Sequence, residues 1–284
     1  DFPDRFFDVG IAEQHAVTFA AGMASKGAKP VVAIYSTFMQ RAVDQVHHDV
    51  AVRGLPVVFA MDRSGAVPDD GETHQGIYDI QVFKAVPGLA ILSPASRSEM
   101  LMALDWALSS GGPVMIRYPK DNCAPDRPWR NSPWVIGQGV LAMQTPGARV
   151  LVAAAGPLSE SALLAAQLLE ASGVHTDVVE LRFLKPVDTD WLLSITRGYE
   201  LCVFAEEGVL HGGVSGDLAA LVREHQPESR SLALGFDEKP MAQADRLSLL
   251  ARAGLDAQGI AKAVLAALTK ENSDAAKQPR RIAL

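Results

Sequence analysis

The sequence predicts an α/β protein of two successive three-layer domains, each built on a mainly parallel sheet. Short apolar runs alternate with segments of helical periodicity, which is typical of strands joined by crossover helices. Residues 119–148, with five prolines and little periodicity, interrupt this alternation, which then resumes. The chain has 284 residues, 48% hydrophobic and 21% charged, so it is large enough and apolar enough for two globular domains.

These observations set the expected domain boundaries. We predict a first domain over residues 1–122, a linker over 123–148 and a second domain over 149–270. Residues 271–284 are charged and poor in apolar side chains, so we expect a disordered tail there. The chain does not begin with Met and starts close to a predicted strand, which suggests a piece of a longer protein.

The composition excludes several classes of function. A net charge of −7 gives no electrostatic footprint for nucleic acid, and no apolar run reaches the length of a membrane span. The first residues do not have the pattern of a signal peptide. Cys123 and Cys202 are far apart and lack metal-ligand spacing, so we expect a cytoplasmic protein without a disulfide framework.

The first domain is expected to open with a strand and a helix. Phe6, Phe7 and Val9 are interpreted as the end of a buried strand, and Gly10 as the turn after it. The helix that follows places these residues on one face: Ala12, Ala16, Phe19, Ala20 and Met23. Further strands are expected at 31–35, 55–62, 89–93 and 114–118, with helices from Ser36 to Gly54 and over 96–108, where Ser96 and Glu99 form a capping box.

This arrangement puts Glu13 in the first turn of a helix, just beyond the carboxyl end of a strand. Open α/β sheets place their ligand chemistry at that edge, and a helix N-terminus favours a carboxylate. From this stretch alone, a solvated first-turn glutamate is the simpler interpretation.

The second domain repeats the pattern. Strands are expected at 150–154, 177–181 and 201–205, and helices over 159–171, 187–196, 212–222, 242–251 and 257–268. Glu206 and Glu207 precede the pair Gly212 and Gly213. The pair either presents helix amides to an anion or allows close packing at a subunit interface.

Polar side chains collect on the loops that follow the strands of the first domain. Residues 63–79 form a long loop rich in Gly and Asp, and loops of this length in compact domains are usually functional. The candidates at this edge are Glu13 after the first strand, Tyr35, Phe38 and Arg41 after the second, Arg63, Asp70 and His74 after the third, and Arg117 at the end of the last. Their common location predicts a binding site.

Five stretches carry a resemblance to a known enzyme family. They are Asp-Val-Gly-Ile-Ala-Glu-Gln-His at 8–15, Ala-Ile-Tyr-Ser-Thr-Phe at 33–38, Gln-Arg-Ala-Val-Asp-Gln at 40–45, Asp-Gly-Glu-Thr-His-Gln-Gly at 70–76 and Arg-Tyr-Pro at 117–119. They resemble the 1-deoxy-D-xylulose-5-phosphate synthases, thiamine-diphosphate enzymes of the transketolase superfamily. The resemblance implies a pyrimidine-binding domain and a transketolase C-terminal-type domain, with the N-terminal domain of such an enzyme absent.

The resemblance also implies cofactor contacts. Glu13 resembles the glutamate that hydrogen-bonds the aminopyrimidine ring nitrogen of thiamine diphosphate, and Phe38 resembles the aromatic residue that stacks on the pyrimidine. Ile11 is expected to line the same site. The diphosphate requires Mg²⁺, whose site the family carries on its N-terminal domain, and we predict no metal ligands in this chain.

The implied substrates are pyruvate and D-glyceraldehyde 3-phosphate, condensed with loss of CO₂ to 1-deoxy-D-xylulose 5-phosphate, a precursor of isoprenoids, thiamine and pyridoxal. Tyr35, Arg63 and Arg117 resemble donors to the aldehyde's phosphate, for which guanidinium groups are suited. Asp70 and His74 resemble polar residues around the reacting carbonyl and hydroxyl groups, and with Glu13 they are the implied catalytic residues. Arg41 belongs to a family motif.

Other assignments stay open at this stage. The beta subunit of a 2-oxo acid dehydrogenase has the same domain pair but does not need paired phosphate-binding arginines. Transketolase itself fits this motif set less well. A non-catalytic partner subunit predicts a decayed pocket, yet Glu13, His74 and both arginines are present. The full enzyme is expected to be a homodimer, with its N-terminal domain on the same or a second chain.

Overall fold

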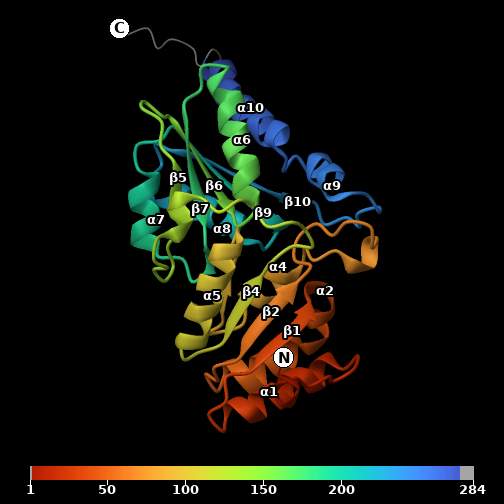
Figure 1. The fold of residues 1–284 in the computed structure, drawn as a ribbon. Coiled ribbons are helices and arrows are strands. Elements are labelled where there is room, and N and C mark those ends of the chain that lie inside the picture. The colour runs from red at the N-terminus through yellow and green to blue at the C-terminus, as the bar shows by residue number, and fades with distance from the viewer. Residues whose placement is uncertain (1, 276–284) are drawn as a thin grey trace, which may run out of the picture.

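The computed structural model describes residues 2–275 as two α/β units. In Figure 1 the first unit, red to yellow, occupies the lower half, and the second, green to blue, the upper half. Each unit is a five-stranded sheet with helices packed on it, and most neighbouring strands run parallel. The predicted fold class of two mainly parallel α/β domains is therefore confirmed.

The first sheet has the strand order β1-β2-β4-β3-β8. Its strands are β1 (Val31–Tyr35), β2 (Val58–Asp62), β3 (Ala90–Leu92), β4 (Val114–Arg117) and β8 (Phe183–Lys185). The first four are parallel to one another, whereas β8 is antiparallel to β3. Since β8 lies within the predicted second domain, a late segment of the chain completes the first sheet.

The helices of the first unit are η1 (Pro3–Arg5), α1 (Glu13–Ala24), α2 (Ser36–Met39), η2 (Gln40–Ala42), α3 (Val43–Gln45), η3 (Val46–Ala51), η4 (Glu72–His74), α4 (Asp79–Lys84) and α5 (Arg97–Ser109). Among them, α5 agrees with the predicted helix over 96–108, whereas the helix predicted from Ser36 to Gly54 is broken into shorter segments. The single helix predicted from Ser36 is thus four consecutive segments, the last of them a π-helix. Half of the predicted capping box is present: Ser96 Oγ accepts from the Glu99 amide, but the Glu99 carboxylate accepts from the Ala95 amide instead of that of Ser96.

The strand predicted around Phe6 is wrong. Residues 6–10 have no regular structure, and the side chains of Phe6 and Phe7 are exposed. The buried face of α1 also differs from the predicted one, because Phe19 is exposed whereas Glu13 and Val17 are buried. Apolar residues before and on α1 therefore lie at the surface beside the candidate site.

The second sheet has the order β10-β9-β6-β7-β5. Its strands are β5 (Val140–Met143), β6 (Val150–Ala155), β7 (Thr176–Leu181), β9 (Leu201–Val209) and β10 (Arg230–Phe236). Only β5 among them pairs antiparallel. Residues 123–148, predicted as a linker, hold β5 and η5 (Pro128–Asn131), and so contribute a strand to this sheet.

Helices cover both faces of the second sheet. They are α6 (Leu158–Glu170), α7 (Thr189–Thr196), α8 (Val214–His225), α9 (Arg246–Ala253) and α10 (Ala257–Ala275). Helices α6 and α10 pack side by side, as Figure 1 shows, and α8 packs on β9 and β10. The predicted tail begins at residue 271, but α10 continues to Ala275, and the rest of that prediction lies outside the described residues.

The two units share a hydrophobic core. One buried cluster runs from Ala16 and Val46 in the first unit, through Ile80 and Phe83 of α4, to Phe204 of β9. Because α4 packs directly on β9, the loop before α4 is held against both units. Within the described residues, no helix combines the length and apolar character needed to cross a membrane.

Candidate active site

Glu13 is the first residue of α1, and its side chain is only 8% exposed. Arg41 of η2 donates from Nη1 to Glu13 Oε1 at 2.8 Å. A carboxylate removed from water at this position needs a charged or hydrogen-bonding partner, and Arg41 provides it. The alternative of a solvated first-turn glutamate is excluded by this burial.

Three aromatic rings lie next to this ion pair and contact one another through Phe38. The Arg41 guanidinium lies 5.2 Å from the centroid of the Phe38 ring, within the range of a cation–π contact. Phe38 packs edge-on against His74 at 5.3 Å and stacks on Tyr35 at 5.7 Å between ring centroids. The break of the predicted helix into short segments places Phe38 and Arg41 on this edge, directly after β1.

Arg63 follows β2 and turns back over the aromatic group. Its backbone has a φ of 58°, a left-handed conformation that side-chain-bearing residues seldom adopt. The guanidinium carbon lies 3.7 Å from the centroid of the Tyr35 ring, and Nη1 pairs with the Asp62 carboxylate. Among the described residues, the buried Arg63 Nε has no hydrogen-bond partner.

Asp70 and Lys120 complete the polar side of the site. Asp70 Oδ2 lies 3.9 Å from Arg63 Nε and accepts a 2.9 Å hydrogen bond from Lys120 Nζ. This hydrogen bond, together with the nearby positive charges, lowers the pKa of Asp70. Sequence reasoning missed Lys120, although it follows the carboxyl end of β4 and the same edge rule would have found it.

His74 joins the aromatic and polar sides. It ends η4, and its Nδ1 lies 3.0 Å from Thr73 Oγ1. The carbonyl of Thr73 in turn accepts from Thr37 Oγ1 at 3.0 Å, which ties η4 to α2. The structure therefore brings seven predicted residues together along one sheet edge: Glu13, Tyr35, Phe38, Arg41, Arg63, Asp70 and His74.

Two predicted residues lie apart from this group. Ile11 precedes α1 and is 95% exposed. Arg117 is buried at the end of β4, where Nε and Nη2 donate to the two carboxylate oxygens of Asp79 at 3.1 Å each. Nη2 also donates to the Glu207 carbonyl at 3.0 Å. This geometry favours a structural role for Arg117 over a direct contact with a phosphate.

The pair Gly212 and Gly213 of the second unit precedes a helix whose first amides are bound by a side chain of the same chain, so no ligand is needed to account for it. The amides of Val214 and Ser215, at the start of α8, donate to the Glu206 carboxylate at 3.2 and 2.8 Å. Burial raises the pKa of Glu206. A Cβ at Gly213 would lie 2.1 Å from Glu206 Oε1, so this position requires glycine. The acceptor at this helix terminus is therefore the side chain of the chain's own Glu206.

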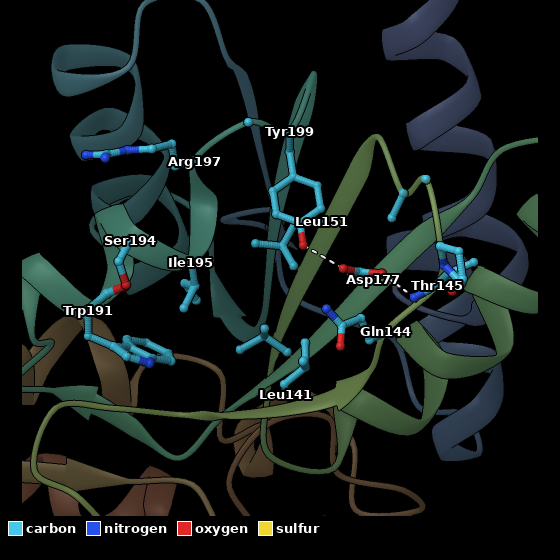
Figure 2. A pocket seen from close by; sticks show the side chains of 15 residues that line it. Leu141, Gln144, Thr145, Leu151, Asp177, Trp191, Ser194, Ile195, Arg197 and Tyr199 are labelled. Carbon is cyan, nitrogen blue, oxygen red and sulfur yellow. Dashed lines mark hydrogen bonds between the residues drawn. The ribbon is translucent and has the colours of Figure 1, made fainter.

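A separate pocket of about 750 Å³ lies in the second unit. Figure 2 shows its lining, with the Tyr199 hydroxyl directed at Asp177, to which it donates at 2.6 Å, and Trp191 on the opposite side. None of the predicted site residues lines it. Among the described residues there is also no group of three His, Cys, Asp or Glu side chains arranged to hold a metal ion.

Comparison with known families agrees with this architecture. A model of the transketolase pyrimidine binding domain matches residues 1–125, and a model of the transketolase C-terminal domain matches residues 139–260. The chain belongs to the transketolase superfamily. Within that superfamily it is similar to the C-terminal portion of the 1-deoxy-D-xylulose-5-phosphate synthases.

Individual relatives show what fraction of the length of such an enzyme this chain matches. The synthase of Treponema pallidum is 48% identical over 260 residues, which are 92% of this chain and 41% of that protein. Synthase 1 of Geobacter sulfurreducens is 43% identical over 279 residues, or 97% of this chain and 43% of that protein. The chain thus spans about two fifths of the length of these relatives.

Two solved structures share the fold. One is described as "Split gene transketolase, inactive beta4 tetramer"; it is 29% identical, with a TM-score of 0.85 over 94% of this chain and 86% of that chain. The other is transketolase from Campylobacter jejuni, 20% identical, with a TM-score of 0.74 over 92% of this chain and 39% of that chain.

Proposed function

We propose that this chain carries the pyrimidine-binding and substrate-loop part of a thiamine-diphosphate enzyme. The reaction is the condensation of pyruvate with D-glyceraldehyde 3-phosphate to 1-deoxy-D-xylulose 5-phosphate and CO₂. One observation carries the proposal: the buried Glu13, paired with the exposed Arg41, and Phe38 lie beside the Arg63–Asp70 group on a single sheet edge. Relatives named as this synthase support it.

The residues present fit the pyrimidine half of the cofactor. When bound, thiamine diphosphate supplies a carbon nucleophile and an electron sink through its thiazolium ring. Glu13, shielded from water and held by Arg41, is placed to share a proton with a ring nitrogen of the aminopyrimidine. Phe38 is proposed to present its aromatic ring to the same ring, and Ile11, which is exposed in this chain, is proposed to cover it only when the cofactor is bound.

The polar side of the site fits a phosphorylated aldehyde. Arg63, with a buried Nε that lacks a partner among the described residues, is the proposed main donor to the phosphate, assisted by Tyr35 and Lys120. Asp70 and His74 are proposed to contact the reacting carbonyl and hydroxyl groups, since a histidine donates or accepts protons near neutral pH. For Arg117 we propose support of this region through Asp79.

The alternatives fit these residues less well. A 2-oxo acid dehydrogenase beta subunit would share the domain pair but would not need the cationic group of Arg63 and Lys120. A non-catalytic partner would not need to retain a buried, paired Glu13 next to Phe38 and His74.

The rest of the enzyme is part of the same proposal. The N-terminal portion, on the same or a second chain, would hold the diphosphate and Mg²⁺, and the complete enzyme would be a cytoplasmic homodimer. The exposed apolar side chains of Phe6, Phe7 and Ile11 beside Glu13 support such a partner surface. A solved chain of similar extent, the split-gene transketolase named above, forms a tetramer described as inactive.

The test is an assay of this chain together with an N-terminal portion from a related synthase. We expect CO₂ release from pyruvate that requires glyceraldehyde 3-phosphate and yields 1-deoxy-D-xylulose 5-phosphate. CO₂ release that requires lipoamide instead would identify the dehydrogenase subunit. A complex that assembles and binds cofactor but releases no CO₂ with either acceptor would identify a non-catalytic partner.

A further inference from the structure

The loop that carries Arg63 and Asp70 is held from the far side by the second unit. The Ala66 amide donates to Glu207 Oε2 at 3.2 Å, and the Ala66 carbonyl accepts from Arg246 Nη1 at 2.8 Å. Both polar groups of one residue in the loop are therefore bound by side chains that lie more than 140 positions later. Ala66 itself is fully buried.

Glu207 and Arg246 also bind one another. Arg246 Nη1 donates to Glu207 Oε2 at 2.8 Å, and Nη2 pairs with Oε1. Arg246 Nε lies 2.8 Å from Asp121 Oδ2, which follows the end of the first unit's last parallel strand. Glu207 is 4% and Arg246 8% exposed, so the ion pair is shielded from water and salt.

Neighbouring residues add to this attachment. The Asp69 amide donates to the Ala244 carbonyl at 3.3 Å, and Gln243 Nε2 donates to the Asp69 carbonyl at 2.6 Å. Residues 243–246, which lead into α9, thus contact the loop at Ala66 and again at Asp69, one residue before Asp70.

The loop backbone is shaped to receive Glu207. Gly65 has a φ of +80°, and a Cβ there would lie 2.4 Å from Glu207 Oε2. The Gly65 amide donates to the Gly76 carbonyl at 2.7 Å, and the Gly76 amide donates back at 3.0 Å. Because Gly65 and Gly76 bind each other, fixing Ala66 also fixes both ends of the loop, next to Arg63 on one side and next to His74 on the other.

We infer that Glu207 and Arg246 are positioning residues for the substrate loop. They touch neither the aromatic group nor the cationic group of the site; they fix the peptide of Ala66 and so set where Arg63 and Asp70 stand. Arg117 extends the same support, because it joins Asp79 to the Glu207 carbonyl. The kinetic consequence rests on the proposed function, whereas the structural consequence does not.

The first test measures amide hydrogen exchange of residues 64–76 in the chain as it stands. Lysine cannot reproduce the guanidinium contacts to Glu207, Ala66 and Asp121, so Arg246→Lys should speed exchange of this loop by about ten- to a hundred-fold. Gln243→Ala, a milder change at an exposed side chain, should speed exchange near Asp69 by less. Unchanged loop exchange in both variants would overturn the inference.

A matched control separates loop positioning from general loosening. Arg130 and Glu180 form another buried Arg–Glu pair, with 2.7 Å between Nη2 and Oε2 and neither side chain exposed, and their hydrogen bonds go to residues outside the loop. Arg130→Lys should leave exchange of residues 64–76 unchanged relative to the rest of the chain. Equal loop loosening in the control would also overturn the inference.

The second test uses the chain complemented with the N-terminal portion. Arg246→Lys should raise KM for glyceraldehyde 3-phosphate about tenfold while KM for pyruvate changes little, and Glu207→Gln should have a smaller effect because its amide oxygen still accepts from Ala66. Equal rises in both KM values would contradict positioning of the phosphate-binding group. Loop loosening in a complex whose unsubstituted form has no synthase activity would refute the proposed function and leave the positioning role standing.

Discussion

Glu13 shows how burial changes the chemistry that a single side chain offers. Its carboxylate is 8% exposed, begins a helix and is bound by Arg41 at 2.8 Å. A glutamate in water would exchange protons with solvent, whereas under the proposed function this one would share a proton with the bound cofactor.

Glu13→Gln should therefore preserve the fold and lower turnover by roughly 10²- to 10⁴-fold, since an amide still accepts from Arg41 but cannot share a proton with the pyrimidine. Hydrogen–deuterium exchange at the thiazolium carbon of the cofactor, in the complete enzyme, measures this step directly. Glu224→Gln, an exposed change on α8, serves as the control. An exchange rate equal to that of the unsubstituted enzyme would rule out the role.

Arg63→Ala should weaken the apparent affinity for glyceraldehyde 3-phosphate by about ten- to a hundred-fold and leave pyruvate nearly unaffected, because a charge-assisted hydrogen bond contributes roughly 1.5–3 kcal/mol. Measuring KM for each of the two substrates in Arg63→Ala tests whether the loss of affinity is confined to glyceraldehyde 3-phosphate. If both rise together, Arg63 serves the cofactor or the structure instead.

Arg117 is expected to respond differently from Arg63. Its removal leaves the carboxylate of Asp79, 1% exposed, without its ion-pair partner, and losing one member of a buried pair costs about 3–5 kcal/mol. Urea denaturation of Arg117→Ala should therefore show a large loss in the free energy of unfolding. If the variant were stable and its defect were confined to the aldehyde substrate, the original prediction that Arg117 contacts the phosphate would be supported instead.

Most of the residues that the sequence predicted correctly as neighbours share one property: each stands at or after the end of a strand at the same sheet edge, with Glu13 the exception because no strand precedes it. That rule placed Tyr35, Phe38, Arg63 and Asp70 together. It could not separate Arg117 from them, because Arg117 also stands at a strand end. Arg117 differs because it pairs with Asp79, which the end of the long loop brings back to the sheet. This is a tertiary contact, which the sequence pattern does not reveal.

At the level of elements, the failures have a common cause. The Phe6–Val9 segment has the apolar pattern of a buried strand, but Val9 alone packs against the core, whereas the side chains of Phe6 and Phe7 are exposed. Strands β5 and β8 were missed because each pairs antiparallel at the edge of a sheet, outside the alternation of parallel strands and crossover helices from which the other strands were predicted. Strand β8 owes its place to pairing with β3, far away in sequence.

Another element-level feature is the charged cluster that fixes η5 between the two sheets. Arg182 Nε donates to Glu99 Oε1 at 2.6 Å, and Arg130 binds Glu180. Burial, followed by the nearby Glu180 carboxylate, raises the pKa of Glu99 to about 8. In the unfolded chain its pKa returns to an ordinary value, so folding favours the protonated form.

The free energy of unfolding should therefore fall as the pH rises from about 4.5 towards 8, by up to roughly 1.4 kcal/mol per pH unit for one proton. The contribution of Glu99 to the free energy of unfolding is fully present below its pKa in the unfolded chain. It is lost as the pH rises through its pKa in the folded chain. Urea denaturation across this window should show a flatter slope for Glu99→Gln than for the unsubstituted chain. Matching slopes would mean that Glu99 stays ionised throughout.

At the scale of the whole molecule, the two units are structurally interdependent. The second supplies β8 to the first sheet, joins its core through α4 and β9, and binds the substrate loop through Glu207 and Arg246. The sequence predicts two domains in succession, and the family matches agree. It does not predict that the later one builds part of the earlier one's site, because these contacts join residues more than 100 positions apart.

The last prediction concerns what this chain does alone. Under the proposed function, Glu13 and Phe38 would contact a pyrimidine and Arg63 would contact a substrate phosphate, and the chain spans about two fifths of the length of the related synthases. We expect residues 1–284 alone to bind thiamine diphosphate weakly and to lack synthase activity, because a pyrimidine ring supplies only part of the contacts that hold the cofactor. Activity should return when the N-terminal portion is added. Calorimetry with cofactor and Mg²⁺, with Glu13→Gln as the control for pyrimidine binding, decides it: tight, Mg²⁺-dependent binding to the isolated chain would mean that a diphosphate site lies within it.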